Sequence, residues 1–158
     1  MIQRIQTVYL AITIILLSIV TVGSTLFSFV NETARYTFSS YGITTYSLEN
    51  DQVINTKTFP IFVGTIALAL LCFLAVMSYK NLARQFKLGR TIFYLYFVML
   101  VTVLVLSFYG DALIDTETTT RELGLGFYLL VAGFPFTFLS NTAIKRDKKL
   151  LESLDRLR

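Results

Sequence analysis

The segment FPIFVGTIALALLCFLAVMSY, Phe59–Tyr79, contains no Asp, Glu, Lys, Arg or His. Three other segments share this property, namely Val8–Val30, Thr91–Tyr109 and Gly124–Ile144. Each is close to the roughly 20 residues that a helix needs to cross the hydrocarbon core of a membrane. We therefore predict an all-α membrane protein, a bundle of four transmembrane helices in a single domain over residues 1–158.

The apolar residues surround each predicted helix instead of following one stripe. A helix at the surface of a soluble protein is apolar on one face only, with a period of 3.6 residues. Hydrophobic residues make up 54% of the chain. Four such segments in a chain of 158 residues exclude an ordinary soluble helical domain.

The charged residues predict the orientation. The N-terminus, the loop between the second and third segments, and the C-terminal tail hold 11 of the 14 basic residues. The remaining two loops hold most of the acids. Short loops rich in Lys and Arg stay in the cytoplasm, so both termini are expected on the cytoplasmic side of a cell inner membrane. The net charge of +4 thus reflects topology and does not predict nucleic-acid binding.

The loop 31–58 shows strand patterns. Ile43–Leu48 and Val53–Thr58 alternate polar residues with β-branched or aromatic ones, and Glu49–Gln52 between them is typical of a turn. We predict a small extracytoplasmic β-hairpin, with Tyr36–Ser40 as a candidate third strand. Two strands alone are marginal in water. The hairpin is therefore expected to rest on the membrane surface or on the acidic loop Gly110–Leu123.

The tail, residues 145–158, is predicted to continue the fourth helix. Three readings stay open: a membrane anchor that sets topology, a docking helix for a partner, or a helix whose leucines pack against Ile2 and Ile5. Anionic headgroups attract basic residues beside the cytoplasmic leaflet. The candidate contacts to lipid headgroups or a partner are Arg4, Lys145, Arg146, Lys148, Lys149, Leu150, Leu154 and Leu157.

Two features concern the helices themselves. Pro135 lies within the fourth segment and is a candidate kink, because proline removes a backbone hydrogen bond. Small residues one turn apart, such as Thr21 and Thr25, let helix backbones approach closely. They fit packing within the chain or a homo-oligomer. Val8–Val30 is longer than the apolar region of a signal peptide, so we expect it to be retained.

Reactive groups are scarce. The chain has no His, and Cys72 is its single cysteine. Asn141 is the deepest strongly polar residue of the predicted spans, one turn from Lys145, and is expected at the interface. The Asp111–Thr120 stretch is interpreted as a solvated acidic loop. No metal site, cofactor or catalytic residue is predicted, and the protein is expected not to be an enzyme.

The chain resembles the domain-of-unknown-function 4293 family. The resemblance rests on the opening MIQRIQT, Met1–Thr7, on Tyr79–Asn81, and on the ending from Ala143–Asp147 through Leu154–Arg158. It implies a small bacterial protein of the cytoplasmic membrane with four spans. It carries no established activity, so it assigns no functional residue.

Two functions fit these observations. The first is a non-enzymatic accessory or scaffold protein that acts through Met1–Thr7 and Lys145–Arg158, with membrane lipids or an unknown membrane partner. The alternative is a small oligomeric transporter or lipid-binding membrane protein, which would use the Pro135 kink and the hydroxyl-bearing helix faces.

Overall fold

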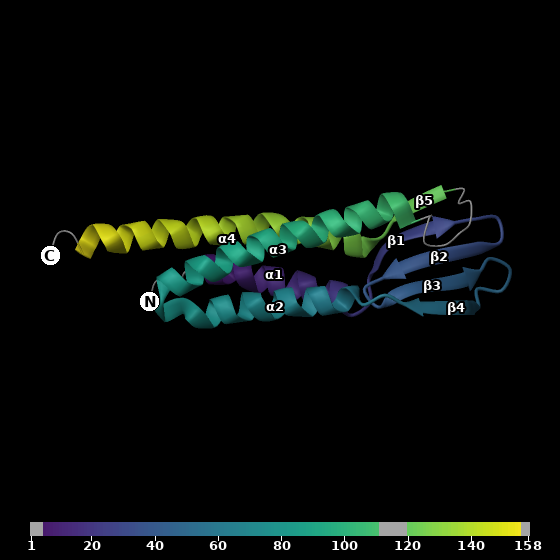
Figure 1. Cartoon of the computed structure of the whole chain (residues 1–158), viewed down its shortest axis with the longest axis horizontal. Helices are drawn as coiled ribbons and strands as arrows, with labels where there is room; N and C mark the ends of the chain where they lie inside the picture. The colour runs from purple at the N-terminus through teal and green to yellow at the C-terminus, as the bar shows by residue number, and fades with distance from the viewer. Residues whose placement is uncertain (1–4, 111–119, 156–158) are drawn as a thin grey trace.

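The computed structural model describes residues 5–110 and 120–155. Four α-helices lie side by side and a β-sheet extends from one end of them (Figure 1). The first residues of α1 and the last residues of α4 lie at the opposite end. In chain order the elements are α1 (Ile5–Thr21), β1 (Thr25–Val30), β2 (Ala34–Ser39), β3 (Gly42–Ser47), β4 (Val53–Thr58), α2 (Ile61–Met77), the 3-10 helix η1 (Ser78–Lys80), α3 (Leu82–Tyr109), β5 (Thr120–Leu123) and α4 (Leu125–Asp155).

The prediction of an all-α four-helix bundle is wrong. The five strands form one antiparallel sheet in the order β4-β3-β2-β1-β5, so the fold combines helices with a substantial sheet. The predicted hairpin is present as β3 and β4, and the predicted third strand is β2. The sheet gains β1 from the first predicted span and β5 from the predicted acidic loop.

The first predicted span, Val8–Val30, is two elements. Helix α1 ends at Thr21, and Gly23 then adopts a φ of +114°, a left-handed conformation that glycine tolerates best. Residues 25–30 form β1, which pairs with β2 on one side and β5 on the other. A continuous apolar run does not distinguish a buried strand from a helix. Here the apolar residues serve the core of the sheet.

Three helices are long and apolar enough to cross a membrane: Ile61–Lys80, Leu82–Tyr109 and Leu125–Leu150. Helix α1 is apolar but shorter, with 17 residues. Helix α3 begins nine residues before the predicted Thr91, because the Asn81 side chain caps it by accepting a hydrogen bond from the Arg84 amide at 3.1 Å. The predicted continuation of the fourth helix into the tail is confirmed as far as Asp155.

The turn between β2 and β3 joins the sheet to two helices. The Ser40 hydroxyl donates a hydrogen bond to the Thr21 carbonyl at the end of α1, at 3.1 Å. The Ser40 carbonyl accepts from the Phe62 amide in the first turn of α2 at 2.9 Å, and the Tyr41 carbonyl accepts from the Phe59 amide at 3.1 Å. These bonds satisfy backbone groups that helix ends leave free. They also fix the sheet relative to α1 and α2.

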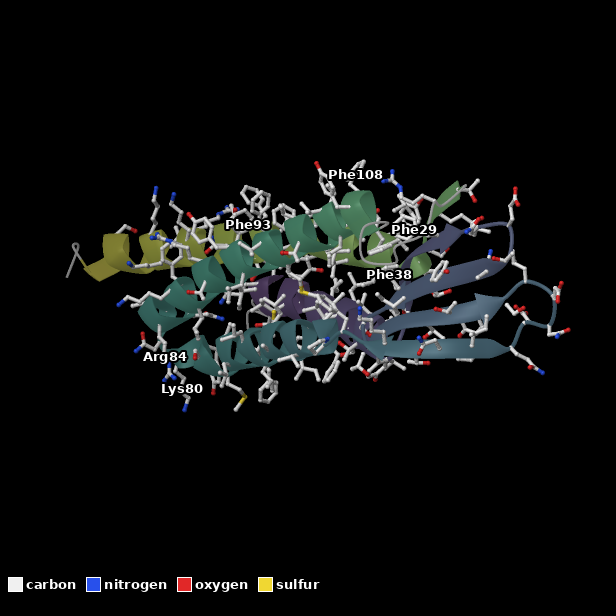
Figure 2. The ribbon with its side chains drawn as sticks, turned by 45° about the vertical axis from the view of Figure 1, so that its right-hand side comes forward. Phe29, Phe38, Lys80, Arg84, Phe93 and Phe108 are labelled. Atoms are coloured by element: carbon white, nitrogen blue, oxygen red, sulfur yellow. The ribbon has the colours of Figure 1, made fainter. Side chains whose placement is uncertain are left out.

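A continuous core crosses this junction. Phe27 stacks on Phe38 with ring centroids 4.4 Å apart. Phe29 meets Phe38 edge-on at 5.5 Å, and Figure 2 shows both of these rings where the sheet meets the helices. Deeper among the helices, the buried Tyr96 hydroxyl of α3 donates to the Leu130 carbonyl of α4 at 2.9 Å. A side chain at Gly133 would collide with that hydroxyl, so glycine allows the close approach of α3 and α4.

The helices are apolar outside and partly polar inside. Large side chains such as Leu70, Phe73 and Val98 are more than half exposed. The buried residues, in contrast, include Thr13, Thr65, Gln85, Thr137 and Ser140. Soluble proteins rarely expose extensive apolar surface. This arrangement suits helices surrounded by hydrocarbon, where polar groups must find partners inside the protein.

Candidate functional site

Basic residues from three helical elements lie at the end opposite the sheet, where Figure 2 labels Lys80 and Arg84. We call this region the basic end. Its residues come from η1, from the first turns of α3 and from the last turns of α4. They are Lys80, Arg84, Lys87, Arg90, Lys145, Arg146, Lys148 and Lys149.

Phe86 brings the two groups of basic residues together. Its half-buried ring lies 4.9 Å from the Arg90 guanidinium carbon and 5.8 Å from the Lys148 ammonium nitrogen. Cations lie favourably over an aromatic face at such distances. One aromatic side chain of α3 therefore lies between a cation of its own helix and a cation of α4.

The predicted contact residues have different environments. Lys145, Arg146 and Lys149 are exposed, and Leu150 is 56% exposed. Leu154 belongs to α4 through its backbone, whereas Arg4 and Leu157 lie outside the described residues. Ile5 is 58% exposed, and its packing against the tail leucines stays a prediction. Ile2 also lies outside the described residues.

Helix α4 runs without interruption through Pro135, whose own surface is exposed. Proline therefore does not end the helix, and a kink at this position stays a prediction. The acidic residues Asp111, Asp115 and Glu117 lie outside the described residues. Within residues 5–110 and 120–155, no three His, Cys, Asp or Glu side chains gather in a way that could hold a metal ion.

Below the basic end lie three amide side chains, which we call the amide cluster: the buried Gln6 and Gln85, and the half-buried Asn141, whose Oδ1 is buried. The Gln6 side-chain Nε2 of α1 donates a hydrogen bond to Gln85 Oε1 of α3 at 3.2 Å, and both residues are fully buried. Ser140 of α4 lies beside them, with its hydroxyl 3.5 Å from the Gln6 carbonyl. The amide cluster therefore joins α1, α3 and α4.

Sequence reasoning missed Gln6 and Gln85 because both were assigned to segments outside the predicted spans. A signal for Gln85 exists in the helical spacing that follows the N-cap Asn81. From that start, one face of α3 carries residues spaced by three and four positions: Gln85, Gly89, Ile92 and Tyr96. That face is buried, so Gln85 is placed inside the protein by the same periodicity as its apolar neighbours.

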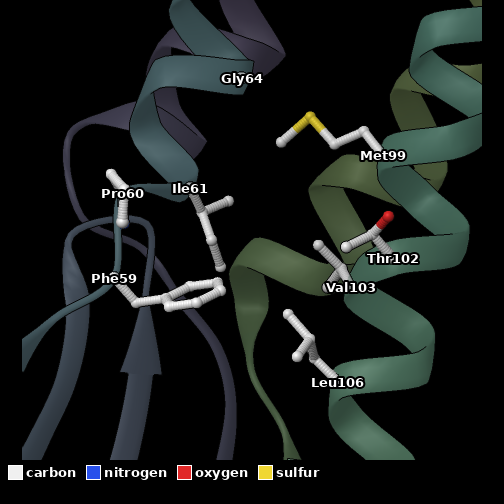
Figure 3. Close-up of a pocket in the computed structure, with 8 residues that line it drawn as sticks. All are labelled: Phe59, Pro60, Ile61, Gly64, Met99, Thr102, Val103 and Leu106. Atoms are coloured by element: carbon white, nitrogen blue, oxygen red, sulfur yellow. The ribbon is translucent and has the colours of Figure 1, made fainter.

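An apolar groove of about 330 Å³ lies between α2 and α3 near the sheet. In Figure 3 the Met99 side chain points from α3 toward α2, while Phe59 and Ile61 extend into the space from the other side. Thr102 is the single hydroxyl-bearing residue in this lining. The full lining is Phe59, Pro60, Ile61, Gly64, Met99, Thr102, Val103 and Leu106.

A family model described as Domain of unknown function (DUF4293) matches residues 2–157. The chain belongs to the DUF4293 family. The match covers all but the first and last residue of the chain, so it includes the motifs at both ends. The resemblance to the DUF4293 family is therefore confirmed over the whole chain. No curated protein matches it.

Proposed function

We propose that the chain is a multi-pass protein of the bacterial cytoplasmic membrane, with its basic end in the cytoplasm and its sheet outside. The charge distribution supports this orientation. The basic end carries Lys and Arg from three short segments, whereas the sheet end mixes acids and bases, including the Arg35–Glu122 ion pair at 3.2 Å. Lys- and Arg-rich segments remain on the cytoplasmic side.

In this proposal α2, α3 and α4 cross the membrane, and α1 also passes alongside them from the basic end to the sheet. At 1.5 Å per residue, the 17 residues of α1 extend about 25 Å, short of the roughly 30 Å of hydrocarbon. Its N-terminal end is held inside the protein by Gln6, which is fully buried against α3 and α4. The polar end of α1 is therefore sheltered from lipid by protein.

We propose that the protein acts without catalysis, as an accessory or scaffold whose basic end contacts anionic lipid headgroups and a membrane partner. The convergence of Arg90 and Lys148 on Phe86 carries this proposal, because it makes one surface from two helices that are far apart in the sequence. Basic residues beside the cytoplasmic leaflet gain up to about 1 kcal/mol each from anionic lipid.

The lipid contact is tested by removing three exposed charges, in the variant Lys145→Gln/Arg146→Gln/Lys149→Gln. In bilayers of mixed composition, spin-labelled phosphatidylglycerol should lose its preference for the protein over spin-labelled phosphatidylcholine. The matched control removes three charges at the sheet end, Arg35→Gln/Lys57→Gln/Arg121→Gln, and should keep most of that preference. Equal loss in both variants would show that net charge alone determines lipid preference, against the proposal.

The partner contact is tested by deleting Leu150–Arg158 and identifying the proteins that co-purify from native membranes after crosslinking. The proposal expects at least one crosslinked partner of the full chain to be lost. An unchanged set of crosslinked proteins, with the shortened chain still in the membrane, would contradict a scaffold role of the tail.

The groove between α2 and α3 favours a second candidate, a lipid-binding membrane protein. Its lining is almost wholly apolar and faces the hydrocarbon in the proposed orientation, as an acyl chain requires. A bulky substitution in the groove, Gly64→Phe, should displace a lipid that co-purifies with the protein. The control Leu70→Phe, on the exposed face of α2, should retain that lipid. Equal lipid content in the two variants would contradict this second candidate.

A further inference from the structure

Three side-chain atoms of the amide cluster are buried and unpaired. They are Gln6 Oε1, Gln85 Nε2 and Asn141 Oδ1, and none has a hydrogen-bond partner among residues 5–110 and 120–155. The Gln6–Gln85 bond uses one group of each glutamine and leaves the other free. Buried polar groups in proteins are almost always satisfied. Gln6 and Gln85 are bonded to each other, and Asn141 Oδ1 lies beside Gly89, one turn after Gln85, so the three free groups indicate a missing hydrogen-bonding partner.

The atoms come from three helices at one level of the protein. Ser140, next to Asn141, lies against the Gln6 backbone, which aligns α4 with the first turn of α1. Gly89 of α3, one turn after Gln85, faces Asn141 of α4. Asn141 is four residues before Lys145, so the cluster lies about 6 Å toward the membrane interior from the first basic residue of α4. An unsatisfied polar group is especially costly at such a depth.

The chemistry of the free atoms selects the ligand. Gln6 Oε1 and Asn141 Oδ1 accept hydrogen bonds, while Gln85 Nε2 donates. A water molecule can donate two hydrogen bonds and accept two, and a buried water typically makes about three. Reversing both glutamine amides still leaves one donor and one acceptor. An anion would meet two carbonyl oxygens, and a metal ion would meet the amide donor, so neither matches this set.

The packing beside the cluster is close at Gly89. A Cβ placed on Gly89 would lie 3.4 Å from Asn141 Oδ1 and 3.2 Å from the Ile144 terminal methyl carbon. A methyl group there would occupy space next to the Asn141 acceptor. Gly89 is itself buried between α3 and α4. Glycine at this position therefore spares Asn141 and Ile144 a close contact with a methyl group.

We propose that Gln6, Gln85 and Asn141 bind an ordered water molecule beside Gly89, which joins α1, α3 and α4 below the basic end. The water accepts a hydrogen bond from Gln85 Nε2 and donates to Gln6 Oε1 and Asn141 Oδ1. The depth of the site rests on the proposed membrane orientation, whereas the pairing of donors and acceptors does not. The site makes the docking of α1 depend on a bound water as well as on apolar packing.

The test is NMR of the full chain in lipid nanodiscs, with ¹⁵N in the Gln and Asn side-chain amides. Water that tumbles with the protein gives cross peaks to the Gln85 amide protons that have opposite signs in laboratory-frame and rotating-frame experiments. Chemical exchange with bulk water gives the same sign in both. The exposed Gln52 amide is the internal reference for bulk water.

Gly89→Ala should remove the Gln85–water cross peak, while Gly64→Ala should retain it, because a Cβ at Gly64 meets only Met99 Sδ at an ordinary 3.8 Å. If Gly89→Ala does not fold, Asn141→Leu removes an acceptor and should reduce the cross peak severalfold. Absence of the cross peak in the unmodified chain, contacts from the Gln85 amide to another side chain instead, or persistence of the cross peak in these variants would overturn the proposal. Because the readout is a side-chain signal, it is independent of any lipid preference or partner of the basic end.

Discussion

At the sheet end, the helices are fixed by backbone hydrogen bonds and a packed aromatic core, whereas at the basic end they are joined by side chains. The Ser40–Tyr41 turn bonds directly to the ends of α1 and α2, next to Phe27 and Phe38. At the basic end, the Gln6–Gln85 hydrogen bond and the contact of Lys148 with the Phe86 ring link different helices, while Arg90 meets that ring from the same helix. The sheet end is thus fixed to the helices through backbone groups, and the basic end exposes most of its charged side chains.

The largest expected effect is at the sheet end. Phe38→Ala removes a side chain that is 3% exposed and packs on both Phe27 and Phe29, so we expect a loss of about 3–5 kcal/mol in unfolding free energy. The control Phe73→Ala, on an exposed helix face, should cost far less. Denaturant titration in detergent measures both. Similar losses of unfolding free energy in the two variants would show that the sheet core contributes no more to stability than an exposed helix face.

At the basic end, Gln85→Leu should cost about 1–3 kcal/mol, because it leaves Gln6 buried without its partner. The double variant Gln6→Leu/Gln85→Leu should recover much of this loss, since no glutamine is then left unpaired. Gln52→Leu, at an exposed turn, should be near neutral. The proposed pairing would be contradicted if the double variant lost more unfolding free energy than the two single variants together.

The junction is tested by Ser40→Ala, which removes the hydroxyl bond to the Thr21 carbonyl. We expect a loss of about 0.5–1.5 kcal/mol, the usual contribution of one hydrogen bond. Ser39→Ala is the matched control, because the Ser39 hydroxyl bonds within the turn, to the Gly42 carbonyl, and not to a helix. Hydrogen exchange at the end of α1 should increase in Ser40→Ala alone.

The smallest expected effect concerns Phe86. Phe86→Leu removes the ring between Arg90 and Lys148 and should cost about 0.5–1 kcal/mol, as expected for exposed cation–ring contacts. Phe86→Tyr keeps an aromatic face and should retain the stability. Thermal unfolding of the two variants separates a ring contact from simple loss of volume.

The sequence identified the elements whose patterns are local. The pairing of Ile43–Leu48 with Val53–Thr58, the strand at Tyr36–Ser40 and the helical tail all followed from alternation or helical spacing. Strand β1 was missed because its residues continue the apolar run of α1, and the change depends on Gly23. Strand β5 was missed because its four residues become a strand only by pairing with β1.

The candidate site was predictable in part. The distribution of Lys and Arg along the sequence predicted that the basic segments lie at one end of the molecule, because short basic segments share one side of a membrane. The Phe86 contacts and the amide cluster were not, because each requires residues of α3 to meet residues of α1 or α4. Asn141 was expected at the interface. The structure leaves Asn141 half-buried, with its Oδ1 buried and facing Gly89.

The most direct test of the account is the side of the membrane on which each end lies. In chains carrying Cys72→Ala, Asn55→Cys in β4 and Ser153→Cys in α4 place a single exposed thiol at the sheet end or the basic end. In intact spheroplasts, a maleimide that does not cross membranes should label Asn55→Cys at once and Ser153→Cys only after lysis. Labelling of Ser153→Cys before lysis, with Asn55→Cys protected, would contradict the account.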